Sequence, residues 1–231
     1  MAADNGGGID DNGLLTVMNS TIEGNTANGV EGGGGIFISA DGSATLENST
    51  VVSNQAWIGG GIFDQGILTI KGSLFSGNRS TETQGSVPTG GGVIAAARSD
   101  SVQLKVKNSR FIGNQAPQSI GGGISVIVSD AGAFQMTGSI LAGNHASDGG
   151  GIAGGPGSVS GSCFLGNTAS LDSTRDIDGN LQAGDNWWGA GNLPHVSRGV
   201  TVASTLSSPP DICASEIPTP YLTIAGPPVS Q

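Results

Sequence analysis

A block of three glycines followed by an aliphatic residue recurs six times along the chain and constrains its fold more than any other feature. The copies begin at residues 6, 33, 59, 90, 121 and 149, so that 26 to 31 residues separate neighbours. A second block of seven residues, ending in Asn, lies between them at residues 19–25, 48–54, 72–78, 108–114, 138–144 and 161–167. Repeats of this length are typical of solenoids, in which each repeat forms one turn.

Strict alternation of apolar and polar residues within each repeat indicates short β-strands. Leu15 and Val17 alternate with polar or exposed positions, and Leu68 and Ile70 repeat the pattern. A repeat of about 28 residues is too short for a parallel strand pair with a connecting helix. We therefore predict an all-β chain, a parallel β-helix of about six to seven turns whose strands stack about 4.8 Å apart.

The composition supports this fold and excludes other classes. Glycine supplies 42 of the 231 residues, and the triple-glycine blocks place much of that excess at corners of the turns. The net charge is −10 with only eight basic residues, which argues against a nucleic-acid partner. No apolar run approaches the roughly 18 residues of a membrane span. Seven of the ten prolines follow residue 190, so we place the β-helix at residues 1–195 and a Pro-rich cap or linker at 196–231.

The seven-residue blocks predict two columns of polar side chains. Stacked asparagines can form hydrogen bonds from turn to turn, and Asn tolerates the left-handed backbone of tight turns. A column of serines lies five residues before it. Because every turn carries both, we interpret them as parts of the fold and not as a ligand site. The asparagines are Asn25, Asn54, Asn78, Asn114, Asn144 and Asn167.

Several of these motifs resemble those of a known family. The glycine blocks alternate with Phe75-Ser-Gly-Asn78, Phe111-Ile-Gly-Asn114 and Phe164-Leu-Gly-Asn167, and residues 185–189 read Asp-Asn-Trp-Trp-Gly. This pattern resembles chlamydial polymorphic outer-membrane proteins and the wider group of right-handed parallel β-helix repeat proteins that bacteria secrete, of pectate-lyase-like fold. The resemblance implies a right-handed β-helix over about residues 6–195 and an extracellular or cell-surface location, with the signal peptide absent from this chain. The fold itself carries lyases, hydrolases, adhesins and stalks alike.

The basic residues suggest a ligand-binding face. Half of them fall within thirteen residues, at Arg98, Lys105, Lys107 and Arg110. We expect Lys71, Lys105, Lys107 and Arg110 to project from one outer face, where they would attract a uronate or a sulfated sugar. The alternative is ordinary cross-strand pairing with Glu47, which shares a column with Lys71 and Lys107.

No catalytic constellation stands out in the sequence. Asp10-Asp11 has no matching acids on a following turn, and His145 and His195 lie far apart. Asp172, Asp176 and Asp178 form the densest acidic group and would suit calcium, although they match no known calcium-loop spacing and also suit a solvated turn. We predict no catalytic residue and no cofactor other than this calcium.

The two ends of the predicted rod differ. Trp187 and Trp188 are placed to cover the apolar cross-section of the last turn, and a disulfide from Cys163 to Cys213 would hold the tail against the solenoid. The first turn has no cap in the sequence, which leaves strand edges open to another chain or to an upstream domain.

These observations favour an extracellular structural or adhesive β-helix module of a bacterial surface or secreted protein, without catalysis. One alternative is a polysaccharide lyase or hydrolase that acts on acidic glycans through the basic face. The other is a subunit of an end-to-end filament. The partners that we expect are a carbohydrate or cell-surface ligand and, through the first turn, a second copy of the chain.

Overall fold

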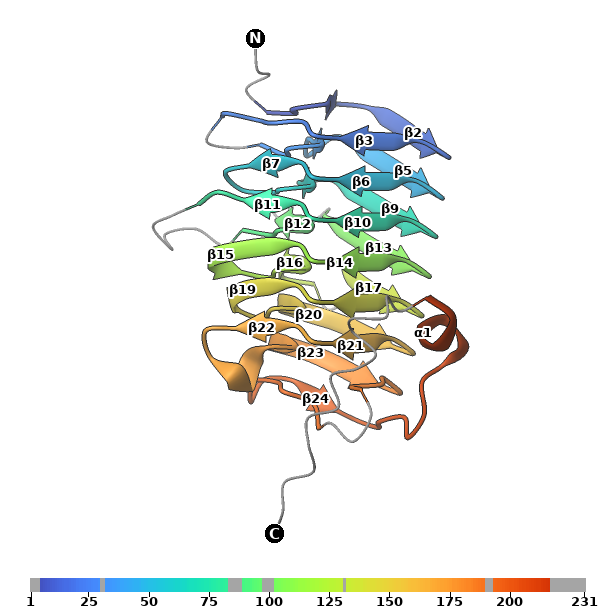
Figure 1. Ribbon diagram of the computed structural model, residues 1–231. Coiled ribbons are helices and arrows are strands. Elements are labelled where there is room, and N and C mark those ends of the chain that lie inside the picture. The colour runs from blue at the N-terminus through green and yellow to red at the C-terminus, as the bar shows by residue number, and fades with distance from the viewer. Residues whose placement is uncertain are drawn as a thin grey trace.

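The computed structural model is a parallel β-solenoid of about six stacked turns, as the repeat predicts (Figure 1). The structure describes residues 5–29, 32–82, 89–96, 102–130, 132–189 and 193–216. Arg98 and the last fifteen residues of the Pro-rich segment, 217–231, lie outside the described part. No described helix is long and apolar enough to cross a membrane.

Two faces of the solenoid belong to one sheet of 13 strands. The first face consists of β1 (Ile9–Asp11), β4 (Ile36–Ile38), β8 (Ile62–Asp64), β12 (Val93–Ala96) and β16 (Ile124–Ile127). The second consists of β2 (Leu14–Met18), β5 (Ser43–Glu47), β9 (Ile67–Lys71), β13 (Gln103–Lys107) and β17 (Phe134–Thr137). The long strands β20 (Ile152–Ser160) and β23 (Ile177–Gly184) span both faces, and β24 (Thr201–Val202) pairs with β23.

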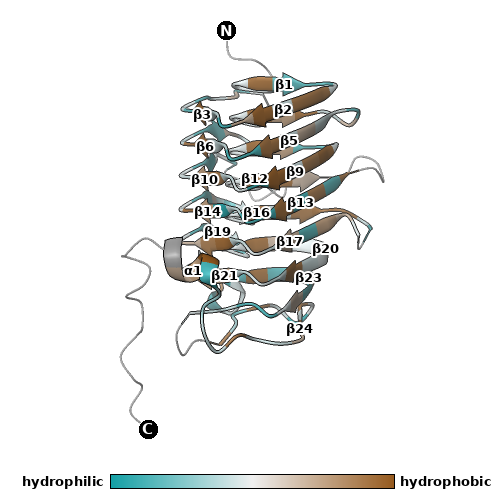
Figure 2. Cartoon of the chain, turned by 90° about the vertical axis from the view of Figure 1, so that its right-hand side faces the viewer, coloured by the Kyte–Doolittle hydropathy of each residue, from teal (hydrophilic) through white to brown (hydrophobic). Residues whose placement is uncertain are grey.

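The remaining strands form two smaller sheets. The six-stranded sheet contains β3 (Thr21–Glu23), β6 (Thr50–Val52), β10 (Leu74–Ser76), β14 (Arg110–Ile112), β18 (Ile140–Ala142) and β21 (Cys163–Leu165). The five-stranded sheet contains β7 (Gln55–Ala56), β11 (Arg79–Ser80), β15 (Gln115–Ile120), β19 (His145–Asp148) and β22 (Thr168–Ala169). A 3-10 helix, η1 (Asp172–Thr174), follows β22, and α1 (Asp211–Glu216) lies beside the lower turns (Figure 2).

The core is built from columns of equivalent residues on successive turns. Inward positions of the second face align Leu46, Ile70 and Val106, all buried. Phe75 and Phe111 stack with ring centroids 4.9 Å apart. Each turn thus buries its apolar side chains on its neighbours, and no turn has a core of its own.

The predicted asparagine column forms a continuous buried network. Asn114 Oδ1 accepts hydrogen bonds from the backbone N–H and the side-chain amide of Asn78, at 3.1 and 3.0 Å. Its own amide donates to the carbonyl of Phe75 and to Oδ1 of Asn144, both at 3.0 Å. The pattern repeats from Asn54 to Asn144, which are fully buried, so every buried amide in this stretch is satisfied.

The left-handed residues, however, are not these asparagines. Positive φ angles occur at the first position of the seven-residue block, for example 49° at Asn48 and Asn108 and 55° at Gly72. The chain reverses its side-chain alternation at this corner, which is why Asn or Gly is needed there. The ladder asparagines are retained for their side-chain amides instead.

The glycine blocks allow neighbouring turns to approach closely. A Cβ atom on Gly34 would collide with the carbonyl oxygen of Gly60, and one on Gly91 with that of Gly122. The middle glycine of each block therefore cannot be replaced without moving the adjacent turn.

Candidate ligand-binding face

Parallel pairing brings three of the four predicted basic residues together on the second face. Lys71 of β9 lies directly opposite Lys107 of β13, and Lys105 lies between Thr69 and Gln135. Strand neighbours are about 4.8 Å apart, so the lysines form a compact group on adjacent turns. We call Lys71, Lys105 and Lys107 the lysine face.

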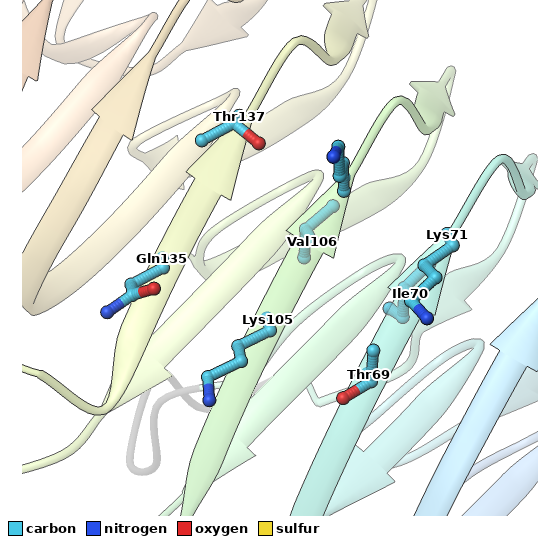
Figure 3. Close-up of a pocket in the computed structure, with 8 residues that line it drawn as sticks. Thr69, Ile70, Lys71, Lys105, Val106, Gln135 and Thr137 are labelled. Carbon is cyan, nitrogen blue, oxygen red and sulfur yellow. The ribbon is translucent and has the colours of Figure 1, made fainter.

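The lysine face surrounds a shallow hollow with a volume of about 230 Å³ (Figure 3). All three lysines are exposed, whereas Ile70 and Val106 between them point into the core. The floor is therefore the sheet itself, and the walls are long cationic side chains beside small polar ones. The hollow is lined by Thr69, Ile70, Lys71, Lys105, Val106, Lys107, Gln135 and Thr137.

The lysine ammonium groups make no close ion pair with a carboxylate of the described residues. Glu47 lies directly opposite Lys71 on β5, as the sequence predicts. Nevertheless, no ion pair within 4.0 Å joins the lysine face to any residue that the structure describes. The register thus places Glu47 beside Lys71, as the cross-strand alternative requires, but their charged groups are more than 4.0 Å apart.

Arg110 does not belong to this group, which corrects the prediction of a four-residue face. It begins β14, between Leu74 and Ile140 of the six-stranded sheet. The left-handed turn at Asn108 separates β13 from β14, so the alternation that aligns Lys105 with Lys107 does not continue to Arg110. Two residues close in sequence thus lie on different faces.

The three predicted calcium ligands are not gathered at one point. Asp172 is exposed on η1 and contacts Arg175 at 3.3 Å, whereas Asp176 is buried and accepts a hydrogen bond from the His195 backbone at 3.2 Å. Asp178 pairs with Ala153 in β23. Within the described ranges, no three His, Cys, Asp or Glu side chains are placed to hold a metal ion. The three aspartates are separated because β23 begins at Ile177, so that Asp172 and Asp176 precede the strand and Asp178 lies within it.

The two tryptophans have different positions, and only one meets the prediction of a cap on the core. Trp188 stacks on Phe164 with centroids 4.6 Å apart and extends the aromatic column of the core. Trp187 points outward into a second cluster with Ile140, Cys163 and Cys213. Cys163 and Cys213 form a disulfide there, which joins α1 to β21.

One buried acid was missed in the sequence. Asp64 ends β8 in the inward column between Ile38 and Ala95 and is fully buried. Oδ1 accepts a hydrogen bond from the Gly66 N–H at 2.9 Å, and Oδ2 has no partner among the described residues. Burial raises the pKa of Asp64 to about 7, against the smaller opposing effect of the Gly66 N–H. The alignment of Ile36 with Ile62 would have revealed it, since it places Asp64 opposite Ile38.

The chemistry available at the lysine face is anion binding. Ammonium groups on a net acidic chain attract anionic groups to this location. None of the residues that line the hollow is an acid, a histidine or a cysteine. The lining thus offers charge and hydrogen-bond donors, and no pair of carboxyl groups for acid–base hydrolysis.

No protein-family model, curated protein or solved structure matches the chain.

Proposed function

We propose that the chain is an extracellular structural or adhesive β-helix module of a bacterial surface or secreted protein, which binds acidic glycans through its lysine face without cleaving them. This proposal includes membership of the β-helix repeat proteins that its motifs resemble. The observation that carries it is the lysine face itself: three exposed lysines on two adjacent strands, with Lys71 and Lys107 in register, line a hollow whose lining residues include no acid.

Two further features support an extracellular role. The Cys163–Cys213 disulfide is typical of proteins from oxidising compartments. The residues that recur in every turn hold the backbone together through buried hydrogen bonds, which suits a rigid spacer. Lys71, Lys105 and Lys107, by contrast, are confined to two turns and make no contribution to the core.

The lysine face also has a geometry that fits a polymer. Lys71 and Lys107 project from neighbouring turns, and Lys105 is two residues from Lys107 on the same strand. An extended polyanion that crosses β9 and β13 would meet Lys71 and Lys107 at the strand spacing of about 4.8 Å. A single carboxylate or sulfate group would make one of these contacts, whereas a longer glycan would make both. Affinity should therefore rise with the length of the glycan.

The test is affinity electrophoresis and calorimetry with polygalacturonate, alginate and heparin, with dextran as a neutral glycan. We expect binding to the three polyanions, weakened by salt, and none to dextran. The double substitution Lys71→Gln/Lys107→Gln should raise the dissociation constant about tenfold or more. Arg79→Gln/Arg198→Gln changes the net charge equally at sites away from the lysine face and should have less than about a twofold effect.

Equal weakening by both double substitutions would reject a specific site, because net charge alone would then account for binding. Measurable cleavage of any of these glycans that Lys107→Ala abolishes would instead establish the enzymatic alternative.

A further inference from the structure

The first described turn consists of regular strands that have a described partner on one side only. β1 pairs with β4, β2 with β5 and β3 with β6, and no other described strand adjoins them. β2 is the longest of the three, with five residues. Its outer backbone N–H and C=O groups are thus available for pairing with another strand.

The outward side chains of β2 are unusually apolar for their position. Leu14 is 86% exposed and Met18 is 52% exposed. At the same two positions the second turn has Ser43 and Glu47, the third has Ile67 and Lys71, and the fourth has Gln103 and Lys107. Of these four turns, the first alone presents an apolar side chain at both positions.

The sequence of β2 is complementary to itself when two copies run in opposite directions. In an antiparallel pair centred on Thr16, Leu14 lies opposite Met18 of the partner subunit, and Leu15 lies opposite Val17 of the partner subunit. Outward residues meet outward residues and inward residues meet inward ones, because both pairs and their symmetry equivalents follow the alternation of the strand. Each apolar cross-strand pair favours association.

We propose that two copies of the chain associate head to head, by antiparallel pairing of β2 with β2 of the second copy. The proposal does not depend on the lysine face, which lies two and three turns further along the rod. Pairing would satisfy the open backbone groups and shield Leu14 and Met18 from water.

Among the residues described up to 216, the opposite end offers no edge strand that matches β2, so the assembly should stop at two copies. There the last strand, β24, has only two residues, Thr201 and Val202. A strand this short is a poor template for pairing. The end-to-end filament considered from the sequence requires two competent ends, and the described structure has one.

Charge in the first turn makes the association dependent on salt. Asp10, Asp11 and Glu23 lie on its strands, and residues 5–29 contain no lysine or arginine. These carboxylates face like charges in a head-to-head pair. Added salt screens that repulsion, so the dimer should tighten as ionic strength rises.

The test is sedimentation velocity on the full chain over a range of concentrations at low and high salt. We expect a monomer–dimer equilibrium without larger species, shifted towards the dimer by salt. Leu14→Lys/Met18→Lys should raise the dimer dissociation constant at least about tenfold. Leu171→Lys/Leu193→Lys replaces exposed leucines at the other end and should leave the dimer unchanged.

A cysteine at the symmetry centre gives an independent measurement of the register. Thr16→Cys should form a disulfide-linked dimer under mild oxidation, because directly opposed Cβ atoms lie about 5 Å apart. Thr69→Cys, in the same column on the third turn, should not. A monomer at all concentrations, with no disulfide-linked dimer of the Thr16→Cys variant, would overturn the proposal. Equal weakening of the dimer by Leu14→Lys/Met18→Lys and by Leu171→Lys/Leu193→Lys would also overturn it.

Discussion

The two ends of the solenoid are made from the same repeat and are finished in opposite ways. The first turn exposes three edge strands, two apolar side chains and the last amide of the asparagine ladder. At the other end Trp188 stacks on Phe164, and the chain turns back so that α1 is bonded covalently to β21. The far end is thus held by an aromatic stack and a covalent bond, whereas the described strands of the first turn have no such closure.

This difference arises from how a solenoid distributes its stability. An inner turn is bonded on both sides, whereas an end turn keeps one set of contacts and needs a separate device to replace the other. At the far end the sequence supplies such devices in the adjacent pair Trp187 and Trp188 and in the two cysteines of the chain, Cys163 and Cys213. At the first turn it supplies no described cap.

The largest predicted effect comes from breaking the ladder inside the rod. Asn114→Ala removes the acceptor of two hydrogen bonds from Asn78 and the donor to Phe75 and Asn144, which leaves several buried groups unsatisfied. We expect a loss of about 5 kcal/mol in the free energy of unfolding, measured by urea denaturation.

Asn25→Ala, the same substitution at the open end, is the matched control. Asn54 Oδ1 still accepts a hydrogen bond from the Asn25 backbone N–H, so the loss should be about 1 kcal/mol. Similar losses for the two variants would show that burial at the end and in the interior is equivalent, contrary to the comparison above.

The second prediction concerns the covalent closure of the far end. Cys163→Ala/Cys213→Ala opens a loop with a sequence separation of 50 residues and removes the attachment of α1. Loop-closure entropy predicts a loss of about 4 kcal/mol in the free energy of unfolding. Reductant should destabilise the wild-type protein and leave the double variant unaffected. An unchanged urea midpoint in the double variant would mean that packing around Trp187 alone holds α1.

The repeat made much of this architecture predictable. Each turn places equivalent residues in the same environment. The same Asn or glycine block therefore has the same structural role in six turns, and its repetition makes that role recognisable in the sequence. That redundancy is lost at features that occur once. Side-chain alternation, continued from Lys105 and Lys107, predicts Arg110 on the same face. Asn108 has a left-handed backbone, however, and the chain passes there from β13 to a different sheet.

The predicted position of Trp187 over the core is wrong for a related reason. Adjacent residues of a strand point to opposite sides, so Trp187 and Trp188 cannot both cover the core. Asp64 was overlooked because its burial follows from pairing between turns, which places it opposite Ile38 and Ala95, and not from any local pattern.

The smallest predicted effect concerns the interior between the two ends. It is the dependence of the free energy of unfolding on pH that buried Asp64 causes. The pKa of Asp64 is about 7 in the folded protein, above its ordinary value of 3.8, because burial disfavours the carboxylate. The folded state therefore holds a proton that the unfolded chain releases, and stability falls as pH rises from about 4 and levels off above about 7. Asp176, with a pKa raised to about 6 by burial, acts in the same direction.

Asp64→Asn removes this titration while it keeps an oxygen for the Gly66 N–H. Between about pH 5 and pH 8 the wild-type protein should lose about 3 kcal/mol more than the variant in its free energy of unfolding. Urea titrations at both pH values measure the difference, and Asp176 contributes equally to both proteins. Parallel pH profiles would mean that water or a rearranged neighbour solvates Asp64, and that the interior turns are less tightly closed than the far end. A flatter profile for the variant alone would instead show that the Asp64 carboxyl holds its proton in the interior, where Ile38 and Ala95 lie on either side of it, unlike the edge strands of the first turn.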